Sequence, residues 1–481
     1  MTRSWLATRA PAVEPLDLLR LAGERGEGRF YYVSRDGWEV CGLGEAAVLA
    51  ADGPGRYRRL AAEAEAAVAS LRFVGDPDMD HRWLPQFVGG FAFAPDWSWQ
   101  AGSPWVGFRG GRLVLPQVTF VRRNGDARLV AVSPVGLGPD DARAYLTARL
   151  DDVSAELERV RAARLAGARP GAPSSSRPQG LAPAAAVDDA AEYEQRVSLA
   201  LDAIDAGALH KVIVARSERW RPTGTLEAAD LLESLALRYP GCFRFCVQPQ
   251  GGPAFVGASP ERLIKVEDRI VHADALAGTA LRDDDAAADA ALGDGLFASP
   301  KERREHQAVV GYLHDRLEGM VPQIEAAAAP QLLKLAHVQH LHTPFRGRLS
   351  DDDAGKGVLE LASRVHPTPA VAGVPTAAAL AWLQEHEDLD RGWYAGGVGT
   401  VAPRGEGEFC VAIRSALLAP GEVRLYAGAG IVEGSEPAQE RAETEQKLRG
   451  LSEALAGQDR GEDRRDVGRV AIEGGEARAH V

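Results

Sequence analysis

Short apolar runs, many of them alternating with polar residues, predict strands along much of this chain. In the first third, FYYVS, WEVCGLG and ARLVAVSPV have this pattern, and the apolar, glycine-rich residues 85–96 predict a buried strand with close backbone neighbours. Helical periodicity covers residues 58–72 and 139–165. Residues 1–165 carry no obvious reactive group, so we interpret them as an N-terminal scaffold region that completes the fold.

The periodicity stops in residues 166–187, where Ala, Pro, Ser and Gly dominate. This composition is typical of a flexible linker. The pattern resumes in residues 188–456, where strand-like runs and helical runs follow one another. Residues 457–481 are charged and rich in glycine, so we expect a disordered tail.

Two cationic residues stand in apolar, strand-like runs. Lys211 begins KVIVARS, where a lysine is either a solvated residue at a strand end or a functional group. EFCVAIRSALLAP predicts a single strand, in which alternation places Arg414 on the face opposite to Val411 and Ile413. A lone arginine in such a strand requires an anion, either a ligand or an ordinary cross-strand carboxylate.

Glu261 follows Ser259 and Pro260 between two apolar runs, so the pattern predicts a turn there. Partial burial on this turn would raise the pKa of the carboxyl group toward that of a working general acid. An exposed turn glutamate is the alternative interpretation.

One predicted helix begins at SPKERREH, with Ser299 as N-cap and Pro300 at the first position. Glu302 fits the reciprocal position of a capping box. Glu305 follows three residues later and adds a second carboxylate near the helix N-terminus.

A second helix follows a glycine-rich turn near the C-terminus, with Ser435 as its expected cap. On it Glu440, Glu443 and Lys447 share one face, because they are spaced three and four residues apart. In an isolated helix this face is ordinarily solvated and forms intrahelical ion pairs. If the two helices converge, their glutamates form an oxygen-rich cleft that suits Mg²⁺.

Composition excludes several classes of protein. With 481 residues, 45% hydrophobic and 26% charged, the chain can bury a large core or form two packed lobes. A net charge of −13 gives no basic field for nucleic acid, and no apolar run is long enough for a membrane span. The N-terminus lacks the apolar core of a secretory signal, so we expect a cytoplasmic protein.

The cysteines follow neither a disulfide nor a metal-ligand pattern. We therefore expect reduced core thiols at Cys41, Cys242, Cys246 and Cys410.

Ordered motifs in residues 190–455 resemble those of the chorismate-binding enzymes, which include isochorismate, salicylate, anthranilate and aminodeoxychorismate synthases. These motifs are KVIVARS, FVGASPERL, ALAGTALR, SPKERREH, HLHTPFRG, HPTPAVAG, YAGGVG, FCVAIRSA and YAGAGIVEGSEPAQERAETEQKL. The resemblance implies an α+β fold in which mostly antiparallel sheets pack as a sandwich flanked by helices. It also implies chorismate as the small-molecule substrate and Mg²⁺ as the cofactor.

The resemblance assigns roles to individual residues. It makes Glu305 and Glu443 direct Mg²⁺ ligands, and Glu302 and Glu440 carboxylates that reach the ion through water. The residues that it implies for substrate binding are Thr279, His340, Ala370, Tyr394, Arg414, Gly428, Gly430 and Lys447.

Three positions distinguish members of this family. Lys211 stands at a position where the family members that add water to chorismate also carry lysine. Ala277 stands where some aminodeoxychorismate synthases carry a nucleophilic lysine. The motif HPTPAVAG, which contains Ala370, is similar to that of isochorismate synthases. Salicylate synthases tend to carry a threonine near the position of Ala370. No glutaminase-type Gly-x-Cys-x-Gly occurs, so we expect no glutamine amidotransferase subunit.

The resemblance therefore implies an isochorismate synthase serving menaquinone or catechol siderophore biosynthesis. Lys211 would activate water for attack at C2 of chorismate, and Glu261 would protonate the departing C4 hydroxyl. The alternatives are a salicylate synthase, which also releases pyruvate, and a catalytically silent chorismate-binding partner subunit.

Overall fold

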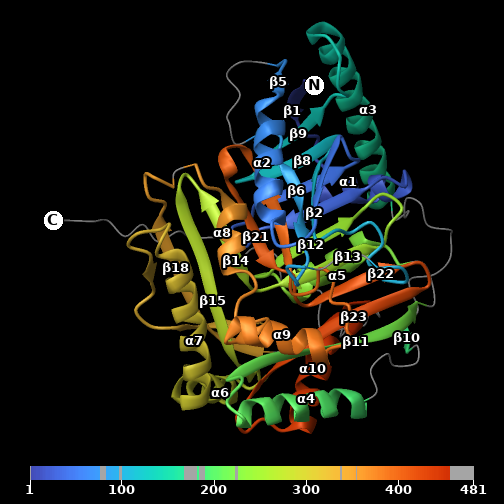
Figure 1. Cartoon of the computed structure of the whole chain (residues 1–481). Coiled ribbons are helices and arrows are strands. Elements are labelled where there is room, and N and C mark those ends of the chain that lie inside the picture. Colours follow the sequence, from blue (N-terminus) through green and yellow to red (C-terminus); the bar gives the residue numbers. More distant parts are fainter. Residues whose placement is uncertain are drawn as a thin grey trace.

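Two large, mostly antiparallel sheets form the centre of the molecule, and helices lie around them (Figure 1). The computed structural model describes residues 2–75, 83–96, 100–166, 181–183, 190–222, 226–335, 338–353 and 355–455. The two antiparallel sheets with helices around them confirm the predicted α+β fold class. No helix within those residues has the length and apolar character needed to cross a membrane.

The first sheet has the strand order β10-β11-β23-β22-β13-β12-β2-β3-β8-β9-β1-β5, and β19 pairs with β11 beside this path. Its strands are β1 (Arg3–Arg9), β2 (Arg29–Val33), β3 (Glu39–Leu43), β5 (Leu71–Phe73), β8 (Val118–Arg123), β9 (Asp126–Val132), β10 (Leu181–Pro183), β11 (Lys211–Pro222), β12 (Phe243–Gln248), β13 (Ala254–Ser259), β19 (Gly373–Val374), β22 (Ser415–Ala419) and β23 (Glu422–Val432).

The second sheet has the order β16-β18-β15-β14-β21-β20-β6-β7-β4, and β17 pairs with β18. Its strands are β4 (Ala47–Ala51), β6 (Phe87–Phe91), β7 (Gly111–Leu115), β14 (Arg262–Glu267), β15 (Ile270–Leu281), β16 (Glu325–Ala326), β17 (Gln331–Lys334), β18 (Val338–Arg348), β20 (Gly397–Val401) and β21 (Gly407–Val411).

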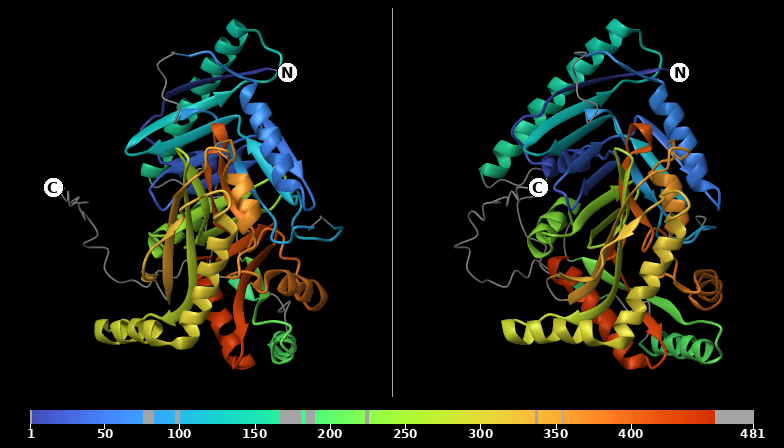
Figure 2. Two further views of the ribbon diagram at one scale, coloured as in Figure 1. Left: turned by 60° about the vertical axis from the view of Figure 1, so that its left-hand side comes forward. Right: turned by 90° about the vertical axis from the view of Figure 1, so that its left-hand side faces the viewer.

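The helices cover the outer faces and ends of these sheets. Against the first sheet lie α1 (Pro15–Glu24), α3 (Pro139–Leu165), α4 (Ala190–Asp205), α5 (Ala228–Arg238) and α10 (Pro437–Leu455). Against the second sheet lie α2 (Arg56–Ala69), α6 (Ala286–Ala298), α7 (Pro300–Leu317) and α8 (Val358–Val365). The helix α9 (Thr376–His386) packs against β19, and the 3-10 turn η2 (Pro403–Gly405) follows β20. Figure 2 shows the N-terminal elements at one end of the molecule and α4 with α10 at the other.

Two hydrophobic layers stabilise this arrangement. The inner layer lies between the sheets, where Phe245 and Phe255 of the first sheet join Phe91 and Phe409 of the second in one buried cluster. The outer layer joins the first sheet to α1, α3, α5 and α10. Burial of this apolar surface is the main force that holds the two sheets together.

The four cysteines are buried and form no disulfide, as predicted. They belong to these layers, with Cys410 in the inner one and Cys41, Cys242 and Cys246 in the outer one.

The N-terminal strands enter both sheets. In the first sheet β2 pairs with β12, and in the second β6 pairs with β20. The regions that flank the predicted linker therefore share one double-layered core. Within the linker, Leu181–Pro183 form β10 and pair with β11. The other predicted linker residues from 167 to 187, and all of the predicted tail, lie outside the described residues.

The prediction of one strand through EFCVAIRSALLAP is wrong. β21 ends at Val411 and β22 begins at Ser415, because the chain leaves the second sheet here and enters the first. Arg414 takes a left-handed backbone conformation, with φ of 51°, at this crossing. Alternation does not continue through such a residue, so Ile413 and Arg414 line the same cavity instead of facing opposite ways.

Close backbone approach in the second sheet leads to a stability prediction. A Cβ at Gly399 would overlap the Glu408 carbonyl oxygen and lie 2.7 Å from Phe409 Cα, so Gly399→Ala should lower the free energy of unfolding by about 3 kcal/mol. Gly311 lies inside α7 with open space at its Cβ position, so Gly311→Ala should raise it by about 1 kcal/mol. Urea denaturation measures both, and equal effects of the same sign would contradict this account of the sheet.

Candidate active site

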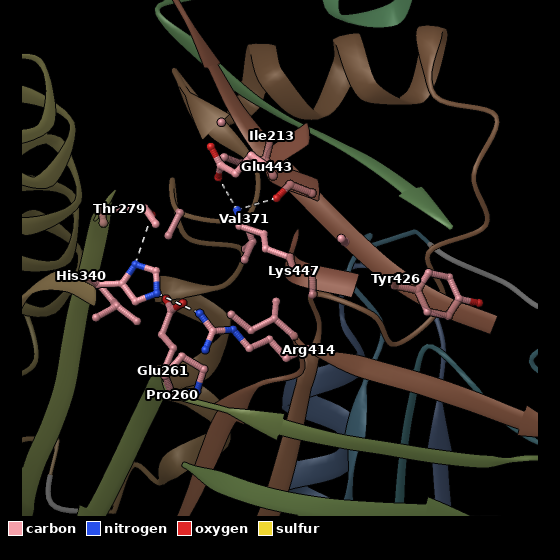
Figure 3. A pocket seen from close by; sticks show the side chains of 18 of the residues that line it. Ile213, Pro260, Glu261, Thr279, His340, Val371, Arg414, Tyr426, Glu443 and Lys447 are labelled. Carbon is pink, nitrogen blue, oxygen red and sulfur yellow. Dashed lines mark hydrogen bonds and ion pairs between the residues drawn. The ribbon is translucent and has the colours of Figure 1, made fainter. Parts of the chain in front are cut away.

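A cavity lies where the first sheet, the second sheet, α7 and α10 meet, and Figure 3 shows it from close by. All predicted site residues except Glu302 and Glu440 line it; these are Lys211, Glu261, Thr279, Glu305, His340, Ala370, Tyr394, Arg414, Gly428, Gly430, Glu443 and Lys447. The structure therefore brings together groups that are up to 236 residues apart in the sequence, from Lys211 to Lys447.

Lys211 is buried at the start of β11, with only 5% of its surface exposed, and it forms an ion pair with Glu305 of α7. The interpretation of a solvated lysine at a strand end is therefore wrong. Space for its side chain comes from Gly430 on β23, where a Cβ would lie 2.9 Å from Lys211 Cε. Burial alone would raise the pKa of the Glu305 carboxyl, but Lys211 and then Lys447 outweigh burial and hold that pKa below its usual range.

Glu261 lies on the predicted turn, between β13 and β14, and is 3% exposed. Burial, and then the negative charge of Asp274, raise the pKa of its carboxyl to about 8, although Lys211 and Arg414 act in the opposite direction. The carboxyl group is consequently protonated at neutral pH and can donate a proton into the cavity. The alternative of an exposed turn glutamate does not hold.

Arg414, His340 and Thr279 form a hydrogen-bonded chain along one wall of the cavity. Arg414 Nη2 donates to His340 Nε2 at 2.9 Å, which leaves His340 Nδ1 to carry the proton and donate toward Gly278 O at 3.2 Å. Thr279 Oγ1 lies 3.1 Å from the same Nδ1. Burial and then the charge of Arg414 keep the pKa of His340 well below its usual value, so the imidazole is neutral.

Lys447 extends from α10 toward β23 at the other side of the cavity. Its ammonium group lies 2.6 Å from Glu443 Oε1 and donates to the carbonyl oxygen of Gly428 at 2.8 Å. Figure 3 shows this pair of residues on one side of the cavity and Arg414, beside Glu261, on the other. Cationic groups therefore flank the space from both directions.

Glu302 does not act as a reciprocal cap. Ser299 caps α7 as predicted, since its hydroxyl accepts from Glu302 N at 3.3 Å. The Glu302 carboxylate instead accepts from Thr279 N at 3.1 Å. A β-bulge in β15, with Gly278 at φ of 77°, turns that amide toward α7.

On α10, Ser435 stands two residues before the helix, and its hydroxyl accepts from Val432 N at 3.2 Å. It is therefore not the N-cap itself. Ser435 also hydrogen-bonds the Glu440 carboxyl group, which lowers a pKa that burial raises more strongly.

The predicted metal ligands interact with one another through their charges. Burial raises the pKa of Glu302, and the charges of Glu305 and Glu443 raise it further. Burial also raises the pKa of Glu440, with Glu443 adding to the effect. Within the described residues no three acidic, histidine or cysteine side chains already form a ligand cluster. The oxygen-only donor set, and its mutual repulsion, nevertheless fit a hard divalent cation.

Sequence reasoning missed several residues of the wall. Ile213 lies two residues after Lys211, on the same face of β11. Tyr426 lies two residues before Gly428 on β23. Strand alternation could therefore have identified Ile213 and Tyr426. The Tyr426 ring stacks on Tyr394 with centroids 5.2 Å apart. The other missed residues are Pro260, Leu276, Gly278, Val371, Arg391, Ala395, Ile413 and Ala427.

Arg391 differs from the other cations of the cavity. It is buried, forms a bidentate pair with Glu387 at 2.5 and 2.8 Å, and donates to the carbonyl oxygens of Ile213 and Val371. All three nitrogens of its guanidinium group are already bonded to protein groups, so we interpret Arg391 as a structural residue.

The family model described as chorismate binding enzyme matches residues 4–456, and the chain belongs to that family. The salicylate biosynthesis isochorismate synthase of Pseudomonas aeruginosa is 39% identical over 372 residues, which cover 77% of this chain and 74% of that protein. The isochorismate synthase MenF of Bacillus subtilis is 30% identical over 456 residues, covering 93% and 92%. The structure of MenF from Escherichia coli, a menaquinone-specific isochorismate synthase, superposes with a TM-score of 0.74 at 28% identity over 94% of each chain.

The raised pKa of Glu261 predicts a pH-dependent cost in stability. Between pH 4.5 and 8 the unfolded chain releases this proton while the folded protein retains it, so rising pH favours unfolding. Glu261→Gln removes the effect. The free energy of unfolding of the wild type, relative to this variant, should fall by about 3 kcal/mol between pH 5 and 7.5.

Urea denaturation at both pH values measures this difference. The matched control is Glu385→Gln, because Glu385 is exposed and distant from the cavity, and it should show no such change relative to the wild type. A constant difference between the wild type and Glu261→Gln would mean that Glu261 is ionised throughout.

Proposed function

We propose that this chain is an isochorismate synthase, which isomerises chorismate by adding water at C2 and releasing the C4 hydroxyl group. The observation that carries the proposal is the shared cavity of a buried lysine, Lys211, and a buried, protonated carboxylic acid, Glu261. Enzymes of this name among the relatives support it.

Substrate binding depends on charge complementarity, because chorismate is a dianion. Arg414 is partly buried and has no carboxylate partner among the described residues, so a ligand carboxylate would provide its counterion. Lys447 contributes a second cation that is already oriented by Gly428 O and Glu443. The neutral His340 orients the Arg414 guanidinium without competing for the anion.

The reaction requires a base for the incoming water and an acid for the leaving hydroxyl. Lys211, as the free amine, accepts a proton from a water molecule while the oxygen of that water bonds to C2 of chorismate. The ring double bonds shift, and Glu261 gives its proton to the C4 oxygen, which departs as water. One water is consumed and one released, so the net change is an isomerisation. Lys211 must first separate from Glu305 or pass its proton on, because only the free amine can act as a base.

The metal site belongs to this proposal. Glu305 and Glu443 would hold Mg²⁺ directly, with Glu302 and Glu440 acting through water. The ion would neutralise a substrate carboxylate and position the ring. The chain's own cations, Arg414 and Lys447, would then orient the remainder of the substrate.

Ala370 lines the cavity wall, in keeping with a product that is released before pyruvate is lost. We expect a cytoplasmic enzyme whose isochorismate enters menaquinone or catechol siderophore biosynthesis. No glutamine amidotransferase subunit is expected, since water rather than ammonia is the nucleophile.

Incubation with chorismate and Mg²⁺, followed by product analysis, tests the proposal. Isochorismate should form without stoichiometric pyruvate. Lys211→Ala and Glu261→Gln should each lower kcat by about 100-fold or more, with little change in chorismate affinity. Lys334→Ala is the control, because Lys334 is a partly exposed lysine paired with Asp289 away from the cavity. Near-normal kcat in Lys211→Ala would mean that another group activates the water.

The proposed metal ligands lead to a separate prediction. Mg²⁺ should raise the unfolding temperature of the wild type, since it binds only the folded state. Glu443→Gln should abolish both this rise and Mg²⁺-dependent turnover while the protein stays folded. Glu445→Gln on the same helix, which removes a similarly exposed carboxylate paired with Arg441, should retain both. Unchanged behaviour of Glu443→Gln at limiting Mg²⁺ would show that these glutamates are only a solvated face.

A further inference from the structure

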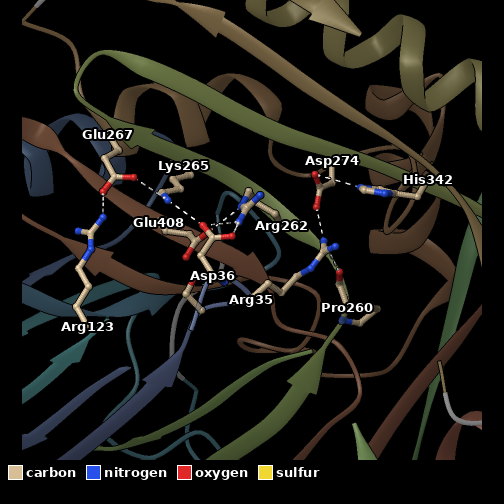
Figure 4. Close-up of polar contacts among 11 residues, drawn as sticks. Arg35, Asp36, Arg123, Pro260, Arg262, Lys265, Glu267, Asp274, His342 and Glu408 are labelled. Atoms are coloured by element: carbon tan, nitrogen blue, oxygen red, sulfur yellow. Dashed lines mark hydrogen bonds and ion pairs between the residues drawn. The ribbon is translucent and has the colours of Figure 1, made fainter. Parts of the chain in front are cut away.

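The turn that carries Glu261 is held by two consecutive residues of the N-terminal region. Arg35 and Asp36 lie in the connection between β2 and β3. Arg35 Nη1 donates to the carbonyl oxygen of Pro260 at 3.3 Å. Arg262 Nη2 donates to both carboxylate oxygens of Asp36 at 3.2 Å. The residues on either side of Glu261 are therefore both bonded to this one connection (Figure 4).

The connection is itself well anchored. Ser34 N donates to the carbonyl oxygen of Trp38 at 2.8 Å and Gly37 N to that of Ser34 at 3.0 Å, which closes a tight turn between the paired strands. Lys265 donates to Asp36 at 2.9 Å. The guanidinium of Arg35 lies 6.0 Å from the ring centroid of Phe243, which is fully buried. These contacts give Arg35 a defined position from which to hold Pro260.

Arg35 also holds a buried carboxylate, Asp274 of β15, which the mechanism above does not use. Asp274 is 4% exposed. Its Oδ2 accepts from Arg35 at 2.7 Å, and its Oδ1 lies 3.2 Å from His342 Nε2 on β18. Burial alone would raise the pKa of this carboxyl, but the contact with His342 and the charges of Arg262 and Arg35 outweigh burial, so Asp274 is ionised.

We propose that Arg35 and Asp274 are positioning residues for the general acid: Arg35 holds the Pro260–Glu261 turn against the cavity, and the fixed negative charge of Asp274 keeps Glu261 protonated until it donates. The proposal rests on the assignment of Glu261 as the acid. Through Arg35 it gives the N-terminal region, which the sequence presents only as scaffold, an indirect part in the reaction.

The charges around Glu261 explain why a second carboxylate is useful there. Lys211 of β11 and Arg414 at the sheet crossing both face Glu261 and favour its ionised form. The proposed reaction requires both of these groups in the same cavity, Lys211 to activate water and Arg414 to bind a substrate carboxylate. Burial, and then the charge of Asp274 in β15, supply the counteracting influence that retains the proton.

The pH dependence of kcat/KM tests the charge. Asp274→Asn keeps the shape and a hydrogen-bond acceptor but removes the negative charge, so Glu261 should lose its proton more readily. The alkaline limb should move to lower pH by about one pH unit, which lowers activity at pH 9 about tenfold relative to the wild type. Asp351→Asn, which removes an exposed carboxylate paired with Arg269, should leave the profile unchanged.

Arg35→Ala tests the positioning independently and keeps the proposal testable if Asp274→Asn does not fold, because Arg35 is partly exposed. It should lower kcat about tenfold with KM nearly unchanged, and Arg35→Lys should recover part of the loss. The unfolding temperature should fall, because buried Asp274 loses an ion-pair partner, so kcat is measured at a temperature where the variant is folded. Equal loss in the lysine and alanine variants, or a loss confined to KM, would overturn the positioning role.

Glu261→Gln separates the two hypotheses. If it retains wild-type kcat, the assignment of Glu261 as the acid fails. If it is inactive while Asp274→Asn keeps the wild-type alkaline limb, the role proposed for Asp274 alone is wrong.

Discussion

Burial of charged groups between two hydrophobic sheets is the constraint on which this active site depends. A charge removed from water must be paired, or the group must become neutral, because an isolated ion in such a place is costly. Lys211 is paired with Glu305, and Asp274 with Arg35, whereas Glu261 retains its proton. Arg414 has no such partner among the described residues, and in the proposed function a dianionic substrate would complete the set.

The architecture explains how these groups meet. The chain crosses from the second sheet to the first at Arg414, and it passes from β13 of the first sheet to β14 of the second at Glu261. Both crossings open on the same cavity, so the proposed acid and the proposed anion-binding cation come from places where regular pairing stops. The strands β11, β15, β18 and β23 then hold Lys211, Thr279, His340 and Gly430 around them.

This arrangement also explains why the family motifs are spread over the chain. Each motif supplies one wall of the cavity from a different element, and the N-terminal strands close the same two sheets. The contacts of Arg35 and Asp36 with the residues beside Glu261 show that this closure reaches the proposed acid itself. Scaffold and site are consequently parts of one packed unit.

The sequence by itself determined what depends on neighbouring residues. The cap of α7 at Ser299, the shared face of Glu443 and Lys447, and the turn at Glu261 follow from local spacing and were correctly predicted. Only the tertiary structure decided which distant groups meet. Three features arise where sheets and helices pack: the ion pair of Lys211 with Glu305, the hydrogen bond from Thr279 to Glu302 and the sheet crossing at Arg414. Burial and backbone direction at these places depend on elements far away in the chain.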